Sequence, residues 1–306
     1  MRICSLLPST TEIVCALGME TSLVGKTHEC DYPPEIGHVE VVTKSLIDHT
    51  ESSSSEIDRH ISEAMHSGSG IYSIDDSALA KINPDLILTQ ELCEVCAVSY
   101  SQVEASVRKL ESDIDVISLE PTTLGGILES VVEIGNAVGA HNEANELSLS
   151  LRKRIERIRE MTSSSSFNPK ILSLEWLDPP FCGGHWVPEM IEYAGGVEAI
   201  SLRESPSREI KWEEAIDASP DLVILMVCGF DLEKTVAEFH NLSKDKSWGS
   251  DFWETFKGEI YIVDGSSYFS RPGPRIVDGL EILAEIIQPE IFPRARPSSD
   301  WVKIAK

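Results

Sequence analysis

Two kinds of apolar pattern alternate along the chain: short runs, and longer segments in which apolar residues recur at helical spacing. The run at residues 2–6 (RICSL) is echoed at residues 170–174 (KILSL), and both are typical of buried parallel strands. A segment of helical pattern that ends in glycine follows each run, at residues 11–18 and 188–196. The same strand-then-helix unit is therefore predicted in both halves.

Further matching segments extend this internal repeat. Residues 83–88 (NPDLIL) match residues 219–225 (SPDLVIL), with proline at the strand entrance, where no ladder donor is needed. Residues 115–119 (DVISL) likewise match residues 259–263 (EIYIV). Because strands and helices alternate in the same order in both halves, we predict an α/β protein with two lobes, each built on a parallel central sheet.

A long helical segment separates the two halves. Residues 122–161 are rich in Leu, Glu, Ala, Arg and Ile and contain no proline, so we expect one long linker helix, with a break near Gly139 left open. The serine run at residues 163–166 lacks the apolar pattern for packing and marks the lobe boundary. We therefore assign residues 1–121 to an N-terminal lobe and residues 168–306 to a C-terminal lobe.

The N-terminal half carries an extra stretch at about residues 47–73. It is polar and serine-rich around residues 52–55, and its pattern is helical over residues 56–66. We interpret this stretch as a surface insertion. A lid over a bound ligand is the alternative.

The size and charge of the chain narrow its function. At 306 residues with 42% hydrophobic content it can form two ordinary cores, since a single core stops growing at roughly 250–300 residues. The formal net charge of -25 opposes binding to phosphate backbones and anionic membranes, because a field of that sign repels them. We therefore expect no nucleic-acid partner. We interpret the acidic charge as a feature that keeps the protein soluble rather than one that serves a role with cations.

Features that report on localisation point to the cytosol. We find no secretory signal and no apolar run of the roughly 18 residues that cross a bilayer. The chain has 7 cysteines, an odd set without the density of a disulfide scaffold. These features predict reduced thiols in a cytoplasmic protein without membrane insertion, and a trimmed targeting segment is the alternative.

Short motifs that occur in a fixed order along the chain carry a resemblance to a known family. They are LLPSTTE at residues 6–12, CDYPP at 30–34, PDLI at 84–87, PPF at 179–181 and PRI at 274–276. With these motifs and the predicted central helix, the chain resembles the vitamin B12 and iron-chelate substrate-binding proteins of ABC transporters, the class III group with a helical backbone. The resemblance implies two Rossmann-like lobes, joined by one rigid helix, that clamp a ligand between them. Open parallel sheets bind ligands beyond the carboxyl ends of their strands, so site residues are expected there.

The resemblance also implies roles for individual residues. Phe181 corresponds to an aromatic residue that packs on the corrin ring. Tyr268, Phe269 and Arg271 fall on the family's late cleft loop. Other positions where the B12 binders place aromatic residues differ in this chain, which argues against cobalamin itself; they are Glu29, Lys44, Gln90 and Ser207.

The family docks on its membrane permease through one exposed glutamate on each lobe. Glu213 occupies the second-lobe position, whereas Ser77, next to Asp76, stands at the first-lobe position. Because one of the two acids is missing, the resemblance implies weakened or absent docking to an ABC permease.

Aromatic side chains are concentrated at residues 175–186, directly after a predicted strand. Flat rings there can stack on a planar ligand, and the glycines allow close backbone approach; core packing of the same rings is the alternative. In the later loop, Arg271 can pair with a carboxylate or phosphate of the ligand, and an interlobe salt bridge is the alternative. The full predicted ligand-binding set is Pro8, Ser9, Glu29, Gln90, Glu91, Trp176, Phe181, His185, Trp186, Tyr268, Phe269 and Arg271.

Cysteines supply a candidate metal site. Cys93 and Cys96 follow the predicted strand at residues 86–89, and Cys228 follows the equivalent strand of the other half. Thiolates at these positions suit zinc, copper(I) or the metal of a bound chelate. A CxxC motif without a second pair is weak, and small core residues are the alternative.

Carboxylates also follow the predicted strands, at Glu91, Glu94, Glu175 and Asp178, where a general acid or base can work if burial shifts its pKa. No nucleophile elbow, phosphate-binding loop or dinucleotide fingerprint follows a strand. We therefore predict a non-catalytic protein that binds a corrinoid or metal-chelate-like ligand, with cobalamin or a transition metal such as zinc as candidate cofactor. The alternative is a cytosolic enzyme or metal-binding protein that uses cleft Cys, His and Glu residues. Sequence alone identifies neither the ligand nor the oligomeric state.

Overall fold

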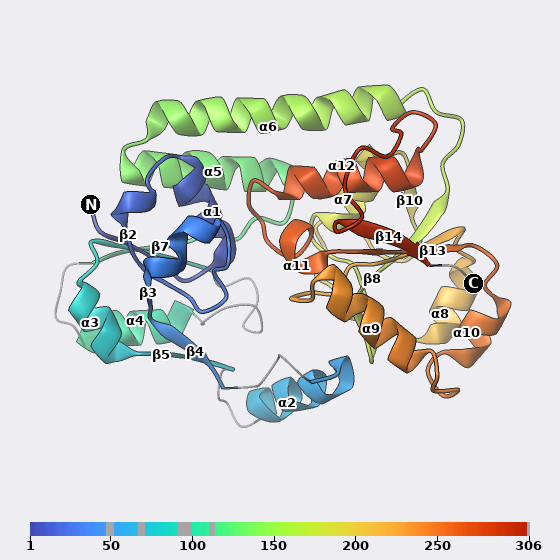
Figure 1. Cartoon of the computed structure of the whole chain (residues 1–306), viewed down its shortest axis with the longest axis horizontal. Helices are drawn as coiled ribbons and strands as arrows, with labels where there is room; N and C mark the ends of the chain where they lie inside the picture. The colour runs from blue at the N-terminus through green and yellow to red at the C-terminus, as the bar shows by residue number, and fades with distance from the viewer. Residues whose placement is uncertain (47–51, 67–70, 91–99, 110–113, 305–306) are drawn as a thin grey trace. The chain divides into compact units, whose positions relative to one another are not determined.

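The computed structural model of the chain divides into two compact units, each with its own sheet (Figure 1). We call them the N-terminal lobe and the C-terminal lobe. The N-terminal lobe comprises Met1–Ser52, Glu56–Pro121 and Gly126–Ser150, and the C-terminal lobe comprises Ser53–Ser55, Thr122–Gly125 and Leu151–Lys306. The structure describes residues 1–46, 52–66, 71–90, 100–109 and 114–304.

The N-terminal lobe is built on a parallel sheet with the strand order β3-β2-β1-β6-β7. The central strand β1 is buried on both faces: Ile3 belongs to one apolar core cluster and Cys4 to another. The strand order reverses between β1 and β6, and open α/β sheets bind ligands at such a switch point. The strands are β1 (Ile3–Ser5), β2 (Leu23–Lys26), β3 (Glu40–Val41), β6 (Leu86–Thr89) and β7 (Asp115–Ser118).

Helices of the N-terminal lobe begin at residues suited to helix starts. Pro8 opens the first helix, where its missing N–H costs no hydrogen bond. Asp75 caps another by accepting hydrogen bonds from the N–H groups of Ser77 and Ala78 at 3.1 and 3.0 Å. The elements are α1 (Pro8–Ala16), α3 (Asp76–Ile82), α4 (Tyr100–Lys109) and the short 3-10 turns Glu20–Ser22 and Pro34–His38.

The predicted insertion contains a helix and borders a small hairpin. The helix α2 spans Ser54–His66, and the strands β4 (Thr43–Ser45) and β5 (Tyr72–Ile74) pair antiparallel on either side of it in the sequence. Ile61 and Ala64 of α2 pack against a core cluster of the N-terminal lobe. Residues 47–51 and 67–70 of the insertion lie outside the described residues.

The segment predicted as one long linker helix forms two helices, α5 (Leu124–Val138) and α6 (His141–Thr162), which lie side by side in Figure 1. The chain turns at Gly139, whose φ of 78° is a left-handed conformation that glycine adopts without strain. The helices approach closely because Gly135 has no side chain: a Cβ there would lie 2.2 Å from the Cβ of Ala144. The break that the sequence left open is thus fixed by packing.

The C-terminal lobe is built on a mixed sheet with the strand order β11-β9-β8-β12-β13-β14, and β10 pairs with β8. Its core is parallel, from β10 through β8 and β12 to β13, while β9, β11 and β14 add antiparallel strands. The strands are β8 (Lys170–Leu177), β9 (Pro180–Cys182), β10 (Val197–Glu198), β11 (Arg208–Glu209), β12 (Leu222–Leu225), β13 (Glu259–Val263) and β14 (Trp301–Ile304).

Helices of this lobe cover the sheet and cap the loops that follow its strands. Asp231 accepts a hydrogen bond from the N–H of Lys234 at 2.8 Å, and Asp264 accepts one from the N–H of Ser267 at 2.7 Å, so helices start soon after β12 and β13. The helices are α7 (Val187–Tyr193), α8 (Trp212–Ala218), α9 (Leu232–Leu242), α10 (Ser250–Thr255), α11 (Gly265–Tyr268) and α12 (Ile276–Ile287).

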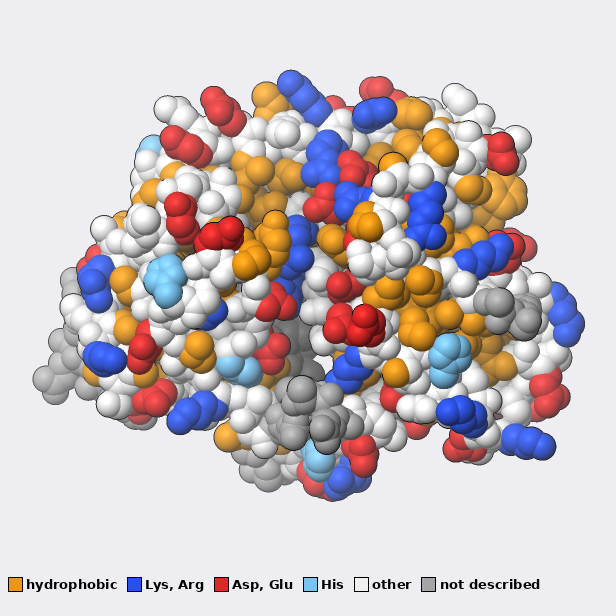
Figure 2. Space-filling model, viewed as in Figure 1, with side chains coloured by type: hydrophobic (Ala, Val, Ile, Leu, Met, Phe, Trp, Pro, Cys, Tyr) orange, Lys and Arg blue, Asp and Glu red, His pale blue; other side chains and the backbone are white. Residues whose placement is uncertain are grey.

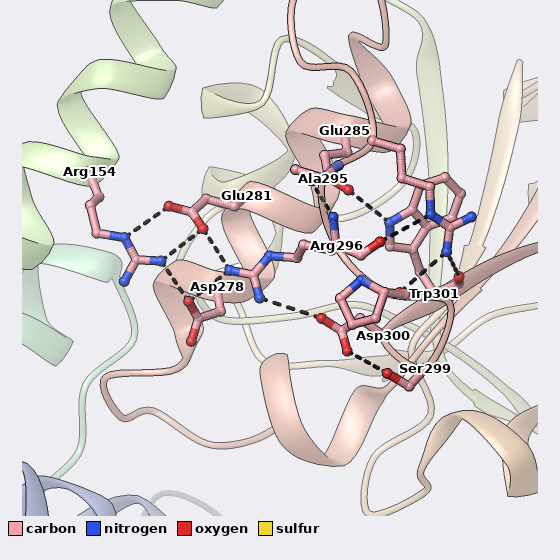
Figure 3. A network of polar contacts seen from close by, with 11 residues as sticks. Arg154, Asp278, Glu281, Glu285, Ala295, Arg296, Ser299, Asp300 and Trp301 are labelled. Carbon is pink, nitrogen blue, oxygen red and sulfur yellow. Dashed lines mark hydrogen bonds and ion pairs between the residues drawn. The ribbon is translucent and has the colours of Figure 1, made fainter.

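An ionic network fastens the part of α6 that begins at Leu151 to the rest of the C-terminal lobe (Figure 3). Arg154 of α6 donates to Glu281 at 2.9 Å and to Asp278 at 2.6 Å, both on α12. Arg296 contacts the same two acids at 2.6 and 2.8 Å and also lies 3.5 Å from Asp300. Burial raises the pKa of Glu281, but hydrogen bonds from both arginines outweigh it and lower the pKa overall.

The structure confirms the two-lobed α/β fold and its internal repeat. The paired segments form β1 and β8, β6 and β12, and β7 and β13, and in each lobe these strands are adjacent and parallel. None of the described helices is both long and apolar enough to span a membrane.

The charged side chains of both signs are mixed on one face of the molecule. Figure 2 shows Asp and Glu side chains interspersed with Lys and Arg on that face, so no single acidic patch covers it.

Candidate functional site

Three loops of the C-terminal lobe leave the carboxyl ends of β8, β12 and β13 and are bonded to one another. The N–H of Cys228 donates to the carbonyl of Glu175 at 2.9 Å, and the N–H of Ser266 donates to the carbonyl of Phe230 at 3.0 Å. Gly265 lies against the backbone, since a Cβ there would come within 2.3 Å of the Val227 carbonyl oxygen. We call residues 175–186, 228–230 and 264–271 together the strand-end surface.

Trp176 and Phe181 form the aromatic part of this surface. They are partners across the β8–β9 hairpin, so their side chains lie on the same face, and both are partly exposed. The ring of Trp176 meets that of Phe230 edge-on with centroids 5.5 Å apart, and Phe230 is only 2% exposed. A buried ring therefore supports Trp176 from within, and the Lys234 ammonium lies 3.8 Å from the same buried ring.

The loop after β9 is bonded to the carboxyl group of Glu175 through its backbone. The N–H of Gly184 donates to the Glu175 carboxylate at 3.1 Å, and burial raises the pKa of Glu175 despite this bond. Position 184 must be glycine because a Cβ would lie 2.2 Å from the backbone nitrogen of Ser207. Burial lowers the pKa of His185, which favours the neutral imidazole, the form that binds metals.

The structure places two of the predicted stacking residues, Trp186 and Phe269, in the core. Their exposed fractions are 6% and 2%, and the Trp186 indole N–H donates to the Phe269 carbonyl at 2.9 Å. This bond joins the start of α7 to the end of α11. The core-packing alternative therefore describes these two rings in this structure, because neither offers a face to a ligand.

Tyr268 and Arg271 remain accessible on the loop after β13. Both side chains are partly exposed, and the Arg271 guanidinium donates to the Ser266 hydroxyl at 3.2 Å. The Tyr268 ring has the guanidinium carbons of Arg275 and Arg296 each 5.9 Å from its centroid. A tyrosine hydroxyl is protonated at neutral pH and can donate a hydrogen bond, and burial raises the pKa of Tyr268 further.

The predicted residues of the N-terminal lobe follow β1, β2 and β6, at the carboxyl edge of that sheet. Pro8 and Glu29 are partly exposed, whereas Ser9 and Gln90 are 4% and 6% exposed. The Glu29 carboxylate lies 3.2 Å from Nε2 of His28. Because β1 and β6 flank the switch point of the sheet, this edge is where that fold binds ligands.

The cysteine site gains no support from the described residues. Glu91, Cys93 and Cys96 lie outside them, as does Glu94. Cys228 is partly exposed, and no group of three or more His, Cys, Asp or Glu side chains in the described part of the chain is placed to hold a metal ion. Cys4, Cys15, Cys182 and Cys228 are free thiols, and burial raises the pKa of Cys4 and Cys15.

The positions implied in permease docking lie at helix starts. Glu213 is exposed in the first turn of α8. On the N-terminal lobe Ser77 is exposed in the first turn of α3, and Asp76 accepts a hydrogen bond from Ser106 at 2.7 Å. The structure therefore offers an acid at one position and a hydroxyl at the other.

Sequence reasoning missed Phe230 as a support of the site. Its signal was present, because Phe230 lies in the loop that follows β12, two residues after Cys228. The missing information was the contact with Trp176, which comes from a distant part of the chain.

Comparison with protein families and curated proteins gave consistent matches. Residues 3–254 match the model of a family described as periplasmic binding protein. An uncharacterized ABC transporter substrate-binding lipoprotein of Bacillus subtilis, YvrC, is 25% identical over 303 residues, which cover 95% of this chain and 81% of that protein. The vitamin B12-binding protein of Vibrio cholerae is 22% identical over 283 residues, 92% of this chain and 86% of that protein.

Solved structures with the same fold cover nearly the whole chain. A periplasmic heme-binding protein from Pseudomonas aeruginosa has a TM-score of 0.71 at 17% identity, covering 100% of this chain and 98% of that one. The periplasmic vitamin B12-binding protein of Vibrio cholerae has a TM-score of 0.65 at 19% identity, covering 96% of this chain and 98% of that one. At these identities the likeness concerns the fold alone.

Proposed function

The chain belongs to the periplasmic binding protein family, and from this premise we propose that it is a substrate-binding protein for a tetrapyrrole, either a corrinoid or a haem. In this proposal the aromatic pair Trp176 and Phe181 on the strand-end surface contacts the macrocycle. Tyr268 and Arg271 contact its polar substituents.

One observation carries the proposal: two partly exposed aromatic residues are cross-strand partners at the carboxyl end of β8, and a buried third ring backs Trp176. Flat aromatic faces favour flat, polarisable ligands, and backing by Phe230 reduces the entropy lost when Trp176 is ordered on binding. The position fits the rule that α/β sheets bind ligands beyond their strand ends.

Relatives support the same ligand class. The names of the curated Vibrio cholerae relative and of the two solved structures give vitamin B12 and heme as their ligands. Both ligands are tetrapyrrole macrocycles with a central metal ion. We extend that shared chemistry, rather than either single ligand, to this chain.

The cytosolic location predicted from the sequence is wrong. The family is that of periplasmic binding proteins, and the Bacillus subtilis relative is a lipoprotein of an ABC transporter, so proteins of this kind act outside the cytoplasm. The absence of a recognised signal and the odd number of cysteines were weak evidence. Free thiols in the described residues do not report on the compartment.

Delivery to an ABC permease is part of the proposal. Glu213, exposed in the first turn of α8, supplies the acid on the C-terminal lobe, and Ser77 on α3 supplies a neutral polar contact on the N-terminal lobe. Complementary charge at such a contact orients the two partners and speeds their encounter. The enzyme alternative receives no support from the relatives, which the comparisons describe as binding proteins.

Absorbance titration of the purified protein tests the ligand class. Cyanocobalamin, haem and a ferric hydroxamate siderophore are each added to constant protein. Saturable one-to-one binding of cyanocobalamin or haem at low micromolar concentration, with weaker binding of the siderophore, is the expected result. Tight binding of the siderophore and none of either tetrapyrrole would show that the aromatic surface does not select flat macrocycles.

A further inference from the structure

The β8–β9 hairpin carries both rings of the proposed site, so the position of its tip matters. The strands pair Leu177 with Pro180, the two residues that flank the turn. Pro180 has no N–H, and therefore it cannot donate to the carbonyl of Leu177. The pairing of β8 with β12 extends only to Leu174, so this neighbour does not reach the tip either.

The carbonyl of Leu177 would thus be a buried acceptor without a strand partner, since Leu177 is 0% exposed. Trp248 fills this role: its indole N–H donates to the Leu177 carbonyl at 2.8 Å, and Trp248 is itself 6% exposed. A residue far along the chain therefore replaces the hydrogen bond that proline removes.

Trp248 is held in place by packing on several sides. Its ring is stacked on that of Trp253 with centroids 5.2 Å apart, and it meets Trp212 and Phe239 edge-on at 5.4 and 6.0 Å. Its backbone is fixed by a turn in which its N–H donates to the Asp245 carbonyl at 3.1 Å. The indole N–H is therefore presented by a rigid aromatic cluster.

We propose that Trp248 is a positioning residue for the strand-end surface: its hydrogen bond to Leu177 fixes the hairpin tip and so sets how Trp176 and Phe181 are presented to a ligand. The effect on ligand binding rests on the proposed function, whereas the support of the hairpin by Trp248 does not. The other edge of the hairpin is supported separately, because the N–H of Ile210 donates to the Pro180 carbonyl at 2.9 Å. Trp248 therefore holds the β8 side of the tip, at Leu177.

Trp253 provides a matched control. It belongs to the same cluster and stacks on Trp248, but its indole nitrogen has no hydrogen-bond partner among the described residues. Trp253→Phe therefore removes a comparable part of a ring without removing a bond to the hairpin. A difference between Trp248→Phe and Trp253→Phe isolates the hydrogen bond from general loosening of the cluster.

The first measurement needs no ligand. Hydrogen–deuterium exchange of the peptide that covers residues 175–184 is compared in the wild type and in both variants. Exchange about tenfold faster in Trp248→Phe, with little change in Trp253→Phe, is expected because only the first leaves a buried carbonyl without a donor. Equal exchange in both variants, or an unchanged hairpin in Trp248→Phe, overturns the proposal. If Trp248→Phe fails to fold, benzothienylalanine at this position keeps the ring shape without the N–H.

The second measurement uses haem and cyanocobalamin as probes. Circular dichroism induced in the visible bands of the bound probe reports how nearby rings are oriented, which a loss of stability alone does not change. Trp248→Phe is expected to weaken this signal and to speed dissociation about tenfold. Wild-type signal and dissociation rate in Trp248→Phe overturn the positioning role. If the wild type binds neither probe, the tetrapyrrole proposal is wrong, and the exchange measurement still decides whether Trp248 holds the hairpin.

Discussion

The carboxylate of Glu238 accepts two hydrogen bonds from Ser54, one from its backbone N–H at 2.7 Å and one from its hydroxyl at 2.6 Å. Ser54 is 0% exposed and begins α2, the helix of the insertion, while Glu238 is 8% exposed on α9. An acid at a helix start satisfies otherwise unpaired N–H groups and complements the helix dipole. Both residues belong to the C-terminal lobe, so this pair holds Ser54 within that lobe.

Breaking this pair should loosen the insertion. We expect Glu238→Gln to lower the free energy of unfolding by about 1–2 kcal/mol, because a buried charge-assisted bond is replaced by a neutral one. Ser54→Ala should cost a similar amount, and the double variant should cost less than the sum of the two. Urea denaturation measures all three. Glu233→Gln, an exposed acid on the same helix, is the control, and equal effects of Glu233→Gln and Glu238→Gln would contradict the role of the pair.

Glu198 should make stability depend on pH. Burial raises its pKa from 4.5 to about 7, although Ser173 and the following backbone N–H groups donate to it. The folded state therefore keeps a proton that the unfolded state loses, so this stabilising contribution is complete below about pH 4.5 and is lost as the pH rises through 7.

Glu198→Gln remains neutral and removes this dependence. We expect the variant to gain stability relative to the wild type as the pH rises from 5 to 8, which thermal unfolding at a series of pH values measures. Glu209→Gln, an exposed acid on β11, serves as the control and should show no such trend. A stability difference between Glu198→Gln and the wild type that stays constant with pH would contradict a raised pKa for Glu198.

The ionic network of Figure 3 should contribute to stability through its shared acids. Glu281 receives hydrogen bonds from both Arg154 and Arg296, so Glu281→Gln weakens two contacts at once. We expect a loss of about 1–3 kcal/mol by chemical denaturation, since the three side chains are only 19–35% exposed. Arg59→Ala is the control, because it removes only an exposed pair with Glu63 on α2, and it should cost under about 1 kcal/mol. A larger loss in Arg59→Ala than in Glu281→Gln would contradict the greater weight given to the partly buried network.

The aromatic pair should dominate ligand affinity. Trp176→Ala and Phe181→Ala are each expected to raise the Kd for the bound tetrapyrrole about tenfold, because each removes one stacking face. Fluorescence quenching or absorbance titration gives the Kd. Phe167→Ala is the control, since Phe167 is 59% exposed but lies outside the strand-end surface. A Kd that changes equally in all three variants would show that the pair has no special role.

Much of the fold could be predicted because the information is local. The apolar run of residues 170–174 and its echo at residues 2–6 indicate their strands without knowledge of any partner. The break in the linker was harder to predict, because a glycine inside a helical pattern costs only about 1 kcal/mol and need not end a helix. What decides the turn at Gly139 is the close packing of Gly135 on Ala144, a contact formed only in the folded protein.

The candidate site was less predictable for the same reason. Trp176, Phe181 and Trp186 lie in one segment, and no sequence pattern separates the two partly exposed rings from the buried one. The difference arises because the Trp186 indole finds the carbonyl of Phe269 far along the chain. No sequence pattern indicated the role of Trp248, because its partner Leu177 lies in a strand far from it along the chain.

Native mass spectrometry tests the central claim, that this periplasmic binding protein holds one tetrapyrrole, most directly. The protein is mixed with equal amounts of cyanocobalamin, haem and a ferric siderophore at low micromolar concentration, and the bound mass is read. A single adduct of one cyanocobalamin or one haem per chain, much reduced in the Trp176→Ala/Phe181→Ala double variant, is the predicted result. Protein that carries no tetrapyrrole, or an adduct of equal abundance on the double variant, would contradict the claim.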